Sequence, residues 1–300
     1  MSFSKVDSYF TSSGTRCKGW LYLPEGEEKP PVIVMAPGFA CEKDFGLQVF
    51  AERFVELGMA VFLFDYRNFG ESEGKPRNLV SYRRHLQDWE AAIAHVKALS
   101  EVNGNKMALW GVSYSGGHVI KMAAKHPELA AVLALVPFAD GMTSIKTMGF
   151  SDMMKVIGAG LRDVFHMLTF RKPYCIPVVA KPGELGCMNS LGTYEGYLAQ
   201  VPEDSKWKNE FPARTCLIAS YYRPIAAARR IKCPVSIIMG DYDTVIYTPS
   251  IQAMAAVIHD CKLTALPMGH FNFYQDKDLF ESIMMLQSEF LTESLGTKYC

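Results

Sequence analysis

The chain has 300 residues, of which 49% are hydrophobic and 21% are charged, so it is long and apolar enough to bury a large core. Its 31 Lys and Arg residues balance 31 Asp and Glu residues, and this neutral charge predicts no nucleic-acid partner and no anionic membrane partner. The longest apolar run, residues 129–139, is too short for a membrane span, which takes about 20 residues.

The chain also lacks the signals of a secreted protein. Residues 1–7 have no apolar core of the kind a signal peptide needs. The eight cysteines form no Cys-x-x-Cys pair, which in a chain of this size is typical of reduced, mostly buried thiols. We therefore expect a cytoplasmic protein; the sequence does not specify its oligomeric state.

Short apolar runs alternate with amphipathic stretches along most of the chain. An antiparallel hairpin is expected first, at residues 6–10 and 18–23. Continuous apolar runs, typical of parallel strands covered on both faces, follow at 32–35, 60–64, 107–110, 131–136, 235–239 and 263–266. Helical stretches are expected at 44–57, 82–99, 114–125, 250–259 and 279–290. This alternation predicts an α/β protein with a doubly wound, mostly parallel sheet.

One long segment breaks the alternation. Residues 140–230 contain no strand–helix repeat, and a structureless loop of that length is implausible in a compact domain. We expect a mostly helical cap, or lid, at 140–230, inserted into a core formed by residues 1–139 and 231–300. Its Met and aromatic residues would form either a flexible apolar lining for substrate or the cap's own core: Met142, Met148, Phe150, Met153, Met154, Phe165, Met167 and Phe170.

A candidate nucleophile stands where the strand at 107–110 gives way to a helix. The sequence Gly111-Val112-Ser113-Tyr114-Ser115-Gly116 places Ser113 at a sharp turn, at the positive end of the helix. Gly111 and Gly116 leave room for the close approach of strand and helix. A serine hydroxyl is a weak nucleophile, so Ser113 requires a base nearby; without one, the segment is an ordinary Gly/Ser-rich turn.

The base and its acidic partner are expected after the last two strands. His270 follows the strand at 263–266, where its imidazole can reach across the sheet edge to Ser113. Asp243 follows the strand at 235–239 and can accept a hydrogen bond from the other imidazole nitrogen. Asp243 is preferred over Asp241, and Asp140 is a further alternative, although aspartates are also common turn residues. Ser113, Asp243 and His270 each lie just beyond a strand, where open α/β sheets build their active sites.

An oxyanion hole is predicted from the loop after the strand at 32–35. Acyl transfer places negative charge on the carbonyl oxygen, and two backbone N–H groups can stabilise it by about 3 kcal/mol each. The backbone N–H groups of Phe39 and Tyr114 are the candidates, and Gly38 permits the close approach. Without the other residues, this loop would be an ordinary turn at a strand end.

Together these residues resemble the α/β-hydrolase family, over residues 1–139 and 231–295. The order Ser113, Asp243, His270 is the family's chain order. The turn Asp65-Tyr66-Arg67-Asn68-Phe69-Gly70-Glu71-Ser72 is similar to the family's D-x-R-G-x-G-x-S, with Asn68 in place of glycine. Two other positions differ: Ser115 replaces the last glycine of G-x-S-x-G, and Ala36-Pro37 replaces the frequent His-Gly. The serine block resembles a peptidase-like branch that includes fungal polyketide thiohydrolases and acyl transferases.

The resemblance implies a serine hydrolase that acts on a carboxylic ester or thioester through an acyl-enzyme. Such an enzyme needs no cofactor and no metal. The sequence contains no metal-ligand motif and no phosphate-binding loop. The implied partner is a small-molecule acyl substrate, such as a polyketide or fatty-acyl chain, free or bound to a carrier or synthase. The alternatives are an acyl transferase, a lyase or cyclase on the same fold, and a non-catalytic ligand-binding protein.

Overall fold

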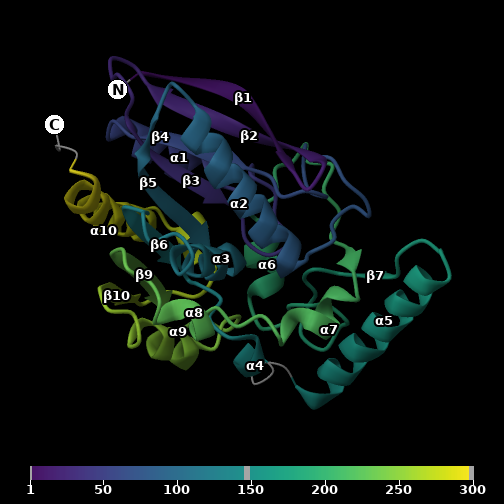
Figure 1. Cartoon of the computed structure of the whole chain (residues 1–300). Helices are drawn as coiled ribbons and strands as arrows, with labels where there is room; N and C mark the ends of the chain where they lie inside the picture. Colours follow the sequence, from purple (N-terminus) through teal and green to yellow (C-terminus); the bar gives the residue numbers. More distant parts are fainter. Residues whose placement is uncertain (1, 145–148, 297–300) are drawn as a thin grey trace.

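The computed structural model describes residues 2–144 and 149–296. Its main element is an eight-stranded sheet of order β1-β2-β4-β3-β5-β6-β9-β10 (Figure 1). The strands are β1 (Phe3–Ser12), β2 (Thr15–Pro24), β3 (Pro31–Ala36), β4 (Ala60–Phe64), β5 (Asn103–Val112), β6 (Ala131–Leu135), β9 (Val235–Gly240) and β10 (Cys261–Leu266). The first two strands form the expected antiparallel hairpin, and the other six are parallel.

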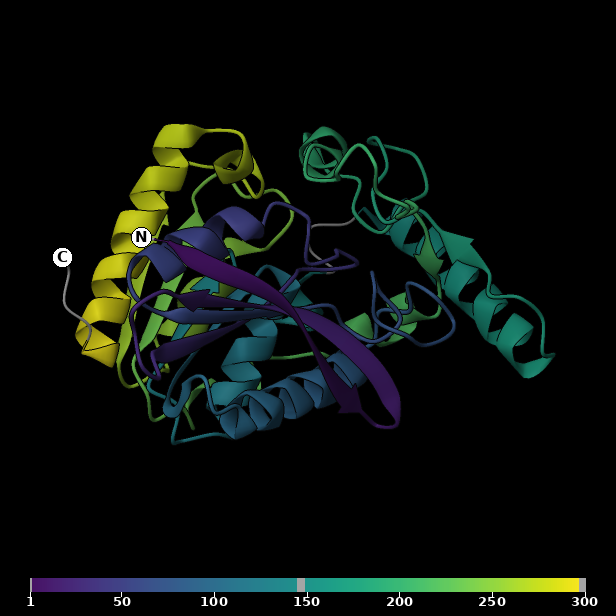
Figure 2. The same ribbon diagram turned by 90° about the horizontal axis from the view of Figure 1, so that it is seen from above.

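Helices cover both faces of this sheet, which is why its central strands are continuously apolar. Every residue of β4, β6 and β9 is buried. One face packs against α1 (Gln48–Glu56) and α10 (Lys277–Leu295), and the other against α2 (Tyr82–Ala98), α3 (Tyr114–Ala123) and α9 (Thr248–Ala255). Figure 2 shows α10 in yellow on the opposite side of the sheet from α2 and α3 in blue. The α/β, doubly wound, mostly parallel fold is confirmed.

The segment between β6 and β9 lies outside this sheet. Its longest helix, α5, projects from the rest of the molecule (Figures 1 and 2). The segment comprises α4 (Gly141–Ser144), α5 (Phe150–Leu168), β7 (Cys175–Ile176), α6 (Thr193–Leu198), β8 (Phe211–Pro212), α7 (Thr215–Ala219) and α8 (Ile225–Ala228), with β7 and β8 forming a small antiparallel sheet. Its role as a cap at 140–230 stays a prediction, and we refer to it below as the cap segment.

Strand register brings separate loops to one edge of the sheet. Ala36 at the end of β3 pairs with Gly111 near the end of β5, so the loops that follow these strands emerge side by side. Gly240 of β9 likewise pairs with Leu266 of β10. Because all four strands are parallel, their carboxyl ends create a single crevice from four distant parts of the sequence.

The sequence predicts no membrane span and reduced, mostly buried thiols. Within the described residues, no helix has both the length and the apolar character needed to cross a bilayer. The seven described cysteines are free, and three of them are buried: Cys17, Cys41 and Cys233. The other four are partly exposed, so the thiols are less buried than the sequence suggested. Cys300 lies outside the described residues.

Candidate active site

Ser113 occupies the turn between β5 and α3, and its backbone conformation is one that residues other than glycine rarely adopt. Its φ is 55° and its ψ is −117°. The conformation is held from both sides, because the Ser113 N–H donates to the Leu135 carbonyl (2.9 Å) and the Phe138 N–H donates to the Ser113 carbonyl (2.8 Å). Such strain persists only where the surrounding structure enforces it, and it is common at functional sites.

The glycines on either side of Ser113 provide the room that the sequence predicted. A Cβ added to Gly111 would collide with the carbonyl oxygen of Ser115 in the first turn of α3. A Cβ added to Gly116 would lie 2.8 Å from the Cβ of Pro137, which follows β6. Both glycines are therefore required by the packing of α3 against neighbouring backbone.

A chain of hydrogen bonds joins the three side chains predicted as nucleophile, base and acid. Ser113 Oγ lies 2.9 Å from His270 Nε2, and His270 Nδ1 lies 2.7 Å from Asp243 Oδ2. The other oxygen of Asp243 accepts hydrogen bonds from the backbone N–H groups of Val245 (2.8 Å) and Ile246 (2.9 Å). The Asp243 side chain is fully buried and that of His270 is only 4% exposed, so the pair is shielded from bulk solvent. Such an arrangement can deprotonate a serine hydroxyl.

The alternative acids are placed elsewhere. Asp241 is exposed on the turn after β9. Asp140 forms an ion pair with Arg223 (2.9 Å) and accepts a hydrogen bond from the Met142 N–H. The geometry therefore favours Asp243 as the partner of His270.

The predicted oxyanion donors lie beside Ser113. A Cβ added to Gly38 would come within 3.4 Å of the Ser113 Cβ, so the backbone at Gly38 runs directly past Ser113. Tyr114 is the first residue of α3, and N–H groups at that position have no acceptor within the helix. The two rings meet edge to face at 5.4 Å between centroids. The role of the Phe39 and Tyr114 backbone N–H groups as an oxyanion hole stays a prediction.

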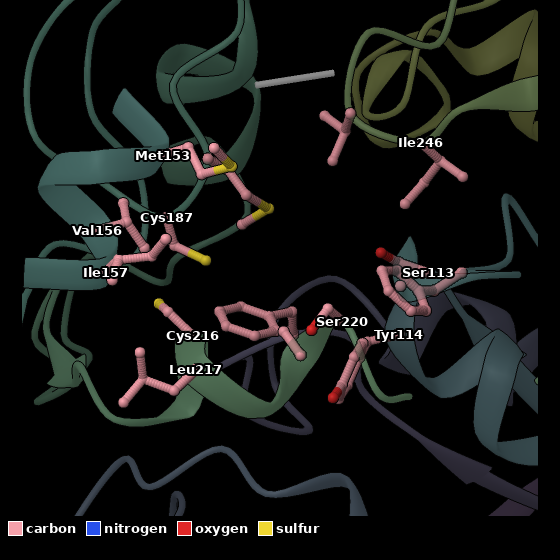
Figure 3. A pocket seen from close by; sticks show the side chains of 16 residues that line it. Ser113, Tyr114, Met153, Val156, Ile157, Cys187, Cys216, Leu217, Ser220 and Ile246 are labelled. Carbon is pink, nitrogen blue, oxygen red and sulfur yellow. The ribbon is translucent and has the colours of Figure 1, made fainter. Parts of the chain in front are cut away.

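A cavity of about 370 Å³ opens from Ser113 into the cap segment (Figure 3). Its walls are almost entirely apolar and come from the core and from α5 and α7: Phe39, Ser113, Tyr114, Phe138, Gly141, Met153, Val156, Ile157, Cys187, Met188, Cys216, Leu217, Ala219, Ser220, Val245 and Ile246. Cys187 and Cys216 both contribute sulfur atoms. A hydrogen bond to Cys187, together with burial, raises the pKa of the Cys216 thiol well above its usual value, so this thiol remains neutral in the cavity.

The expectation about the Met and aromatic residues of 140–230 was largely wrong. Of the eight residues named, Met153 lines the cavity, and Met148 lies outside the described residues. The other six are exposed: Met142, Phe150, Met154, Phe165, Met167 and Phe170. The reason is the helical period, since Met153, Val156 and Ile157 share the inward face of α5, whereas Met154 and Phe165 lie on its outward face.

A second, much smaller cavity of about 20 Å³ also borders Ser113. It borders both Ser113 and His270 and has a more polar lining: Gly38, Phe39, Cys41, Val112, Met188, Tyr197, Gln200, Phe271 and Tyr274. Ser113 therefore borders both a large apolar cavity and a much smaller one whose lining is somewhat more polar.

The described residues contain no cluster of three or more His, Cys, Asp or Glu side chains suited to a metal ion.

The fold and the order of the site residues define the class of α/β hydrolases, and the comparisons with known proteins specify the family. A family described as "Serine aminopeptidase, S33" matches residues 27–277, and the chain belongs to it. The chain is thus a member of a hydrolase family, and its predicted resemblance to the branch with polyketide thiohydrolases and transferases is confirmed.

Several relatives are similar over much of the chain. The "Quorum-quenching protein AidA" of Acinetobacter baumannii is 36% identical over 293 residues, which cover 98% of this chain and 96% of that protein. The "Polyketide transferase grgF" of a Penicillium species is 28% identical over 177 residues, covering 59% of this chain and 58% of that protein. The crystal structure of GrgF superimposes with a TM-score of 0.83 at 24% identity, covering 99% of this chain and all of that one.

Proposed function

We propose that the protein is a serine hydrolase that cleaves carboxylic esters or thioesters through an acyl-enzyme. The observation that carries this proposal is the continuous set of hydrogen bonds from Ser113 through His270 to Asp243, with spacings of 2.9 and 2.7 Å. Ser113 attacks the substrate carbonyl while His270 takes its proton, and Asp243 stabilises the imidazolium that forms. The N–H groups of Phe39 and Tyr114 receive the negative charge on the tetrahedral intermediate.

The larger cavity supports an apolar acyl group as the substrate. A cavity of about 150 Å³ lined by apolar side chains accommodates benzene, so about 370 Å³ corresponds to an acyl chain of roughly a dozen heavy atoms. The cap segment supplies most of the wall opposite Ser113, and we propose that it acts as the cap of the active site. Medium-length fatty-acyl or polyketide chains fit this volume.

The smaller cavity supports water as the acceptor that releases the acyl group. A single water requires about 10–15 Å³, and the chamber beside His270 measures about 20 Å³. A bulky alcohol or amine would not fit without movement of its walls. Transfer to such an acceptor is the second candidate, since relatives named polyketide transferases share the family and the fold.

Intact-mass spectrometry after treatment with a fluorophosphonate tests the proposal. We expect a single adduct on the wild-type protein, located at Ser113 and absent from Ser113→Ala. A set of esters, thioesters and lactones of graded acyl length then defines the substrate, with turnover best at medium length. A folded wild-type protein that remains unlabelled and turns over no ester would contradict the proposal and favour a ligand-binding protein. Product formation that survives in Ser113→Ala would favour a lyase or cyclase.

A further inference from the structure

Side chains of the cap segment hold the loop that carries the Phe39 N–H. The hydroxyl of Tyr197, in α6, donates to the carbonyl oxygen of Phe39 (3.0 Å). The indole Nε1 of Trp207 donates to the carbonyl oxygen of the next residue, Ala40 (2.9 Å). The thiol of Cys41 in turn donates to the Tyr197 hydroxyl (3.3 Å). Three successive residues of the loop are therefore tied to two aromatic residues that lie more than 150 positions along the chain.

The loop needs this support because its backbone is not in a relaxed conformation. Ala40 has a φ of 57°, in the left-handed region that alanine seldom adopts, and its side chain is buried. Across residues 38–41, the Cys41 N–H donates to the Gly38 carbonyl over a long distance of 3.4 Å. The bonds from Tyr197 and Trp207 fix the two carbonyls that follow the Phe39 N–H, and this restricts rotation of the Phe39 backbone.

The aromatic side chains that make these bonds are themselves well fixed. Tyr197 is 2% exposed, and burial raises the pKa of its phenol well above the usual value, so the hydroxyl keeps the proton that it donates. Trp207 packs against Tyr197 and Phe45, with 5.5 Å between ring centroids in each case. The ring of Phe39 is also enclosed, because Phe211 of the cap segment meets it edge to face at 5.3 Å.

Helix α6, which carries Tyr197, also packs against the loop that carries His270. A Cβ added to Gly196, next to Tyr197, would lie 2.8 Å from the Cβ of Phe271, the neighbour of His270. The loop with the predicted oxyanion donor and the loop with the base are thus packed against one short helix of the cap segment. Glycine at position 196 permits this approach.

We propose that Tyr197 and Trp207 are positioning residues that hold the Phe39 N–H in place for the oxyanion, so that acylation of Ser113 depends on contact with the cap segment. This inference rests on the function proposed above. Each residue acts through a carbonyl of the oxyanion loop, and Tyr197 also borders the small cavity beside His270.

Steady-state kinetics of the full-length protein with p-nitrophenyl butyrate tests this proposal, using Tyr197→Phe and Trp207→Phe. Both changes remove a donor and keep an aromatic ring. Since loss of an oxyanion donor costs about a hundredfold or more in kcat, partial misplacement should lower kcat about tenfold while KM stays within about twofold. The double variant should lose less than the product of the single losses, because both bonds support one loop. Tyr221→Phe, on a 73% exposed residue of the same segment, is the matched control and should keep wild-type kinetics.

A trifluoromethyl ketone separates positioning from general damage to the fold. It forms an oxyanion when Ser113 adds to it, so its affinity should fall in parallel with kcat, whereas binding of the product carboxylic acid should not change. Folded variants with kcat within twofold of wild type, or with equal losses for both ligands, would overturn the proposal. If the wild type lacks Ser113-dependent turnover, the proposed function fails and this inference fails with it; wild-type turnover with unaffected variants refutes the inference alone.

Discussion

Asp243→Asn is the substitution that most directly tests the hydrogen-bond chain. The two oxygens of Asp243 have different partners: one accepts from the backbone N–H groups of Val245 and Ile246, and the other accepts from His270 Nδ1. Asparagine can keep the first two bonds only if its carbonyl oxygen faces the backbone. The opposite orientation would place an NH₂ group against two buried N–H donors, at a cost of about 1–3 kcal/mol for each bond lost.

The preferred orientation of asparagine disables the base. Its NH₂ group would then face His270 Nδ1 at the present 2.7 Å, so Nδ1 must become the acceptor and the ring proton must move to Nε2. A protonated Nε2 facing Ser113 Oγ cannot accept the hydroxyl proton. The expected loss in kcat is about 10³–10⁴, or roughly 4–5.5 kcal/mol, in line with the same change in other Ser-His-Asp sites.

The assay is ester hydrolysis together with the rate of fluorophosphonate labelling, both measured on protein shown to be folded. KM should change little, because Asp243 does not border the acyl cavity. Asp241→Asn and Asp140→Asn are the matched controls and should retain wild-type kcat within about threefold. An Asp243→Asn variant with more than a tenth of wild-type kcat would refute the reasoning, as would an equal loss in Asp241→Asn.

Three further predictions concern stability and substrate length. Burial lowers the pKa of His85 from 6.5 to about 3, so its contribution to stability is complete above pH 6.5 and is lost as the pH falls toward 3. Relative to His85→Phe, the wild type should lose about 1.4 kcal/mol of unfolding free energy per pH unit below 6.5, measured by urea unfolding; a constant difference contradicts this. Gln287→Leu removes the acceptor of the buried Trp110 Nε1 (3.0 Å) and should cost about 1–3 kcal/mol; an unchanged unfolding midpoint would refute it. Cys216→Phe narrows the acyl cavity and should lower kcat/KM for long esters more than for short ones; an unchanged ratio would show that the acyl chain binds elsewhere.

The sheet was predictable because its signal is local. Apolar runs of four to six residues are typical of central strands buried on both faces, and they locate β3, β4, β6 and β9 to within about two residues. The prediction of the first helix was less accurate, because α1 begins at Gln48, four residues later than expected. Gly46 has a φ of 69°, which no α-helix accommodates, and Phe45 packs against Trp207 instead of along the helix.

The meeting of Ser113, Asp243 and His270 at the sheet edge was predictable for a different reason. Each of Ser113, Asp243 and His270 follows a strand, and parallel strands bring their carboxyl ends together whatever the loops contain. Tyr197 and Trp207 were missed because nothing in their local sequence marks them. Their contacts with the oxyanion loop depend on how the 91 residues of 140–230 fold back onto the core, and no short pattern encodes that path.

Ser115 shows why a departure from the family's pattern can leave the site intact. The close contacts at the nucleophile turn are made by Gly111 and Gly116, whose added Cβ atoms would meet backbone or proline. Position 115 instead faces a buried hydroxyl: Ser115 Oγ lies 2.9 Å from the phenol of Tyr66, which also accepts the indole N–H of Trp89 (2.9 Å).

A buried serine without a partner would cost about 1–3 kcal/mol, so Ser115 depends on Tyr66. Tyr66 belongs to the turn Asp65–Ser72, the same turn in which Asn68 replaces glycine. Asn68 adopts a φ of 79°, as glycine would, so this second departure also preserves the backbone. The fifth position of the serine motif therefore tolerates a hydroxyl, because the neighbouring turn supplies its hydrogen bond.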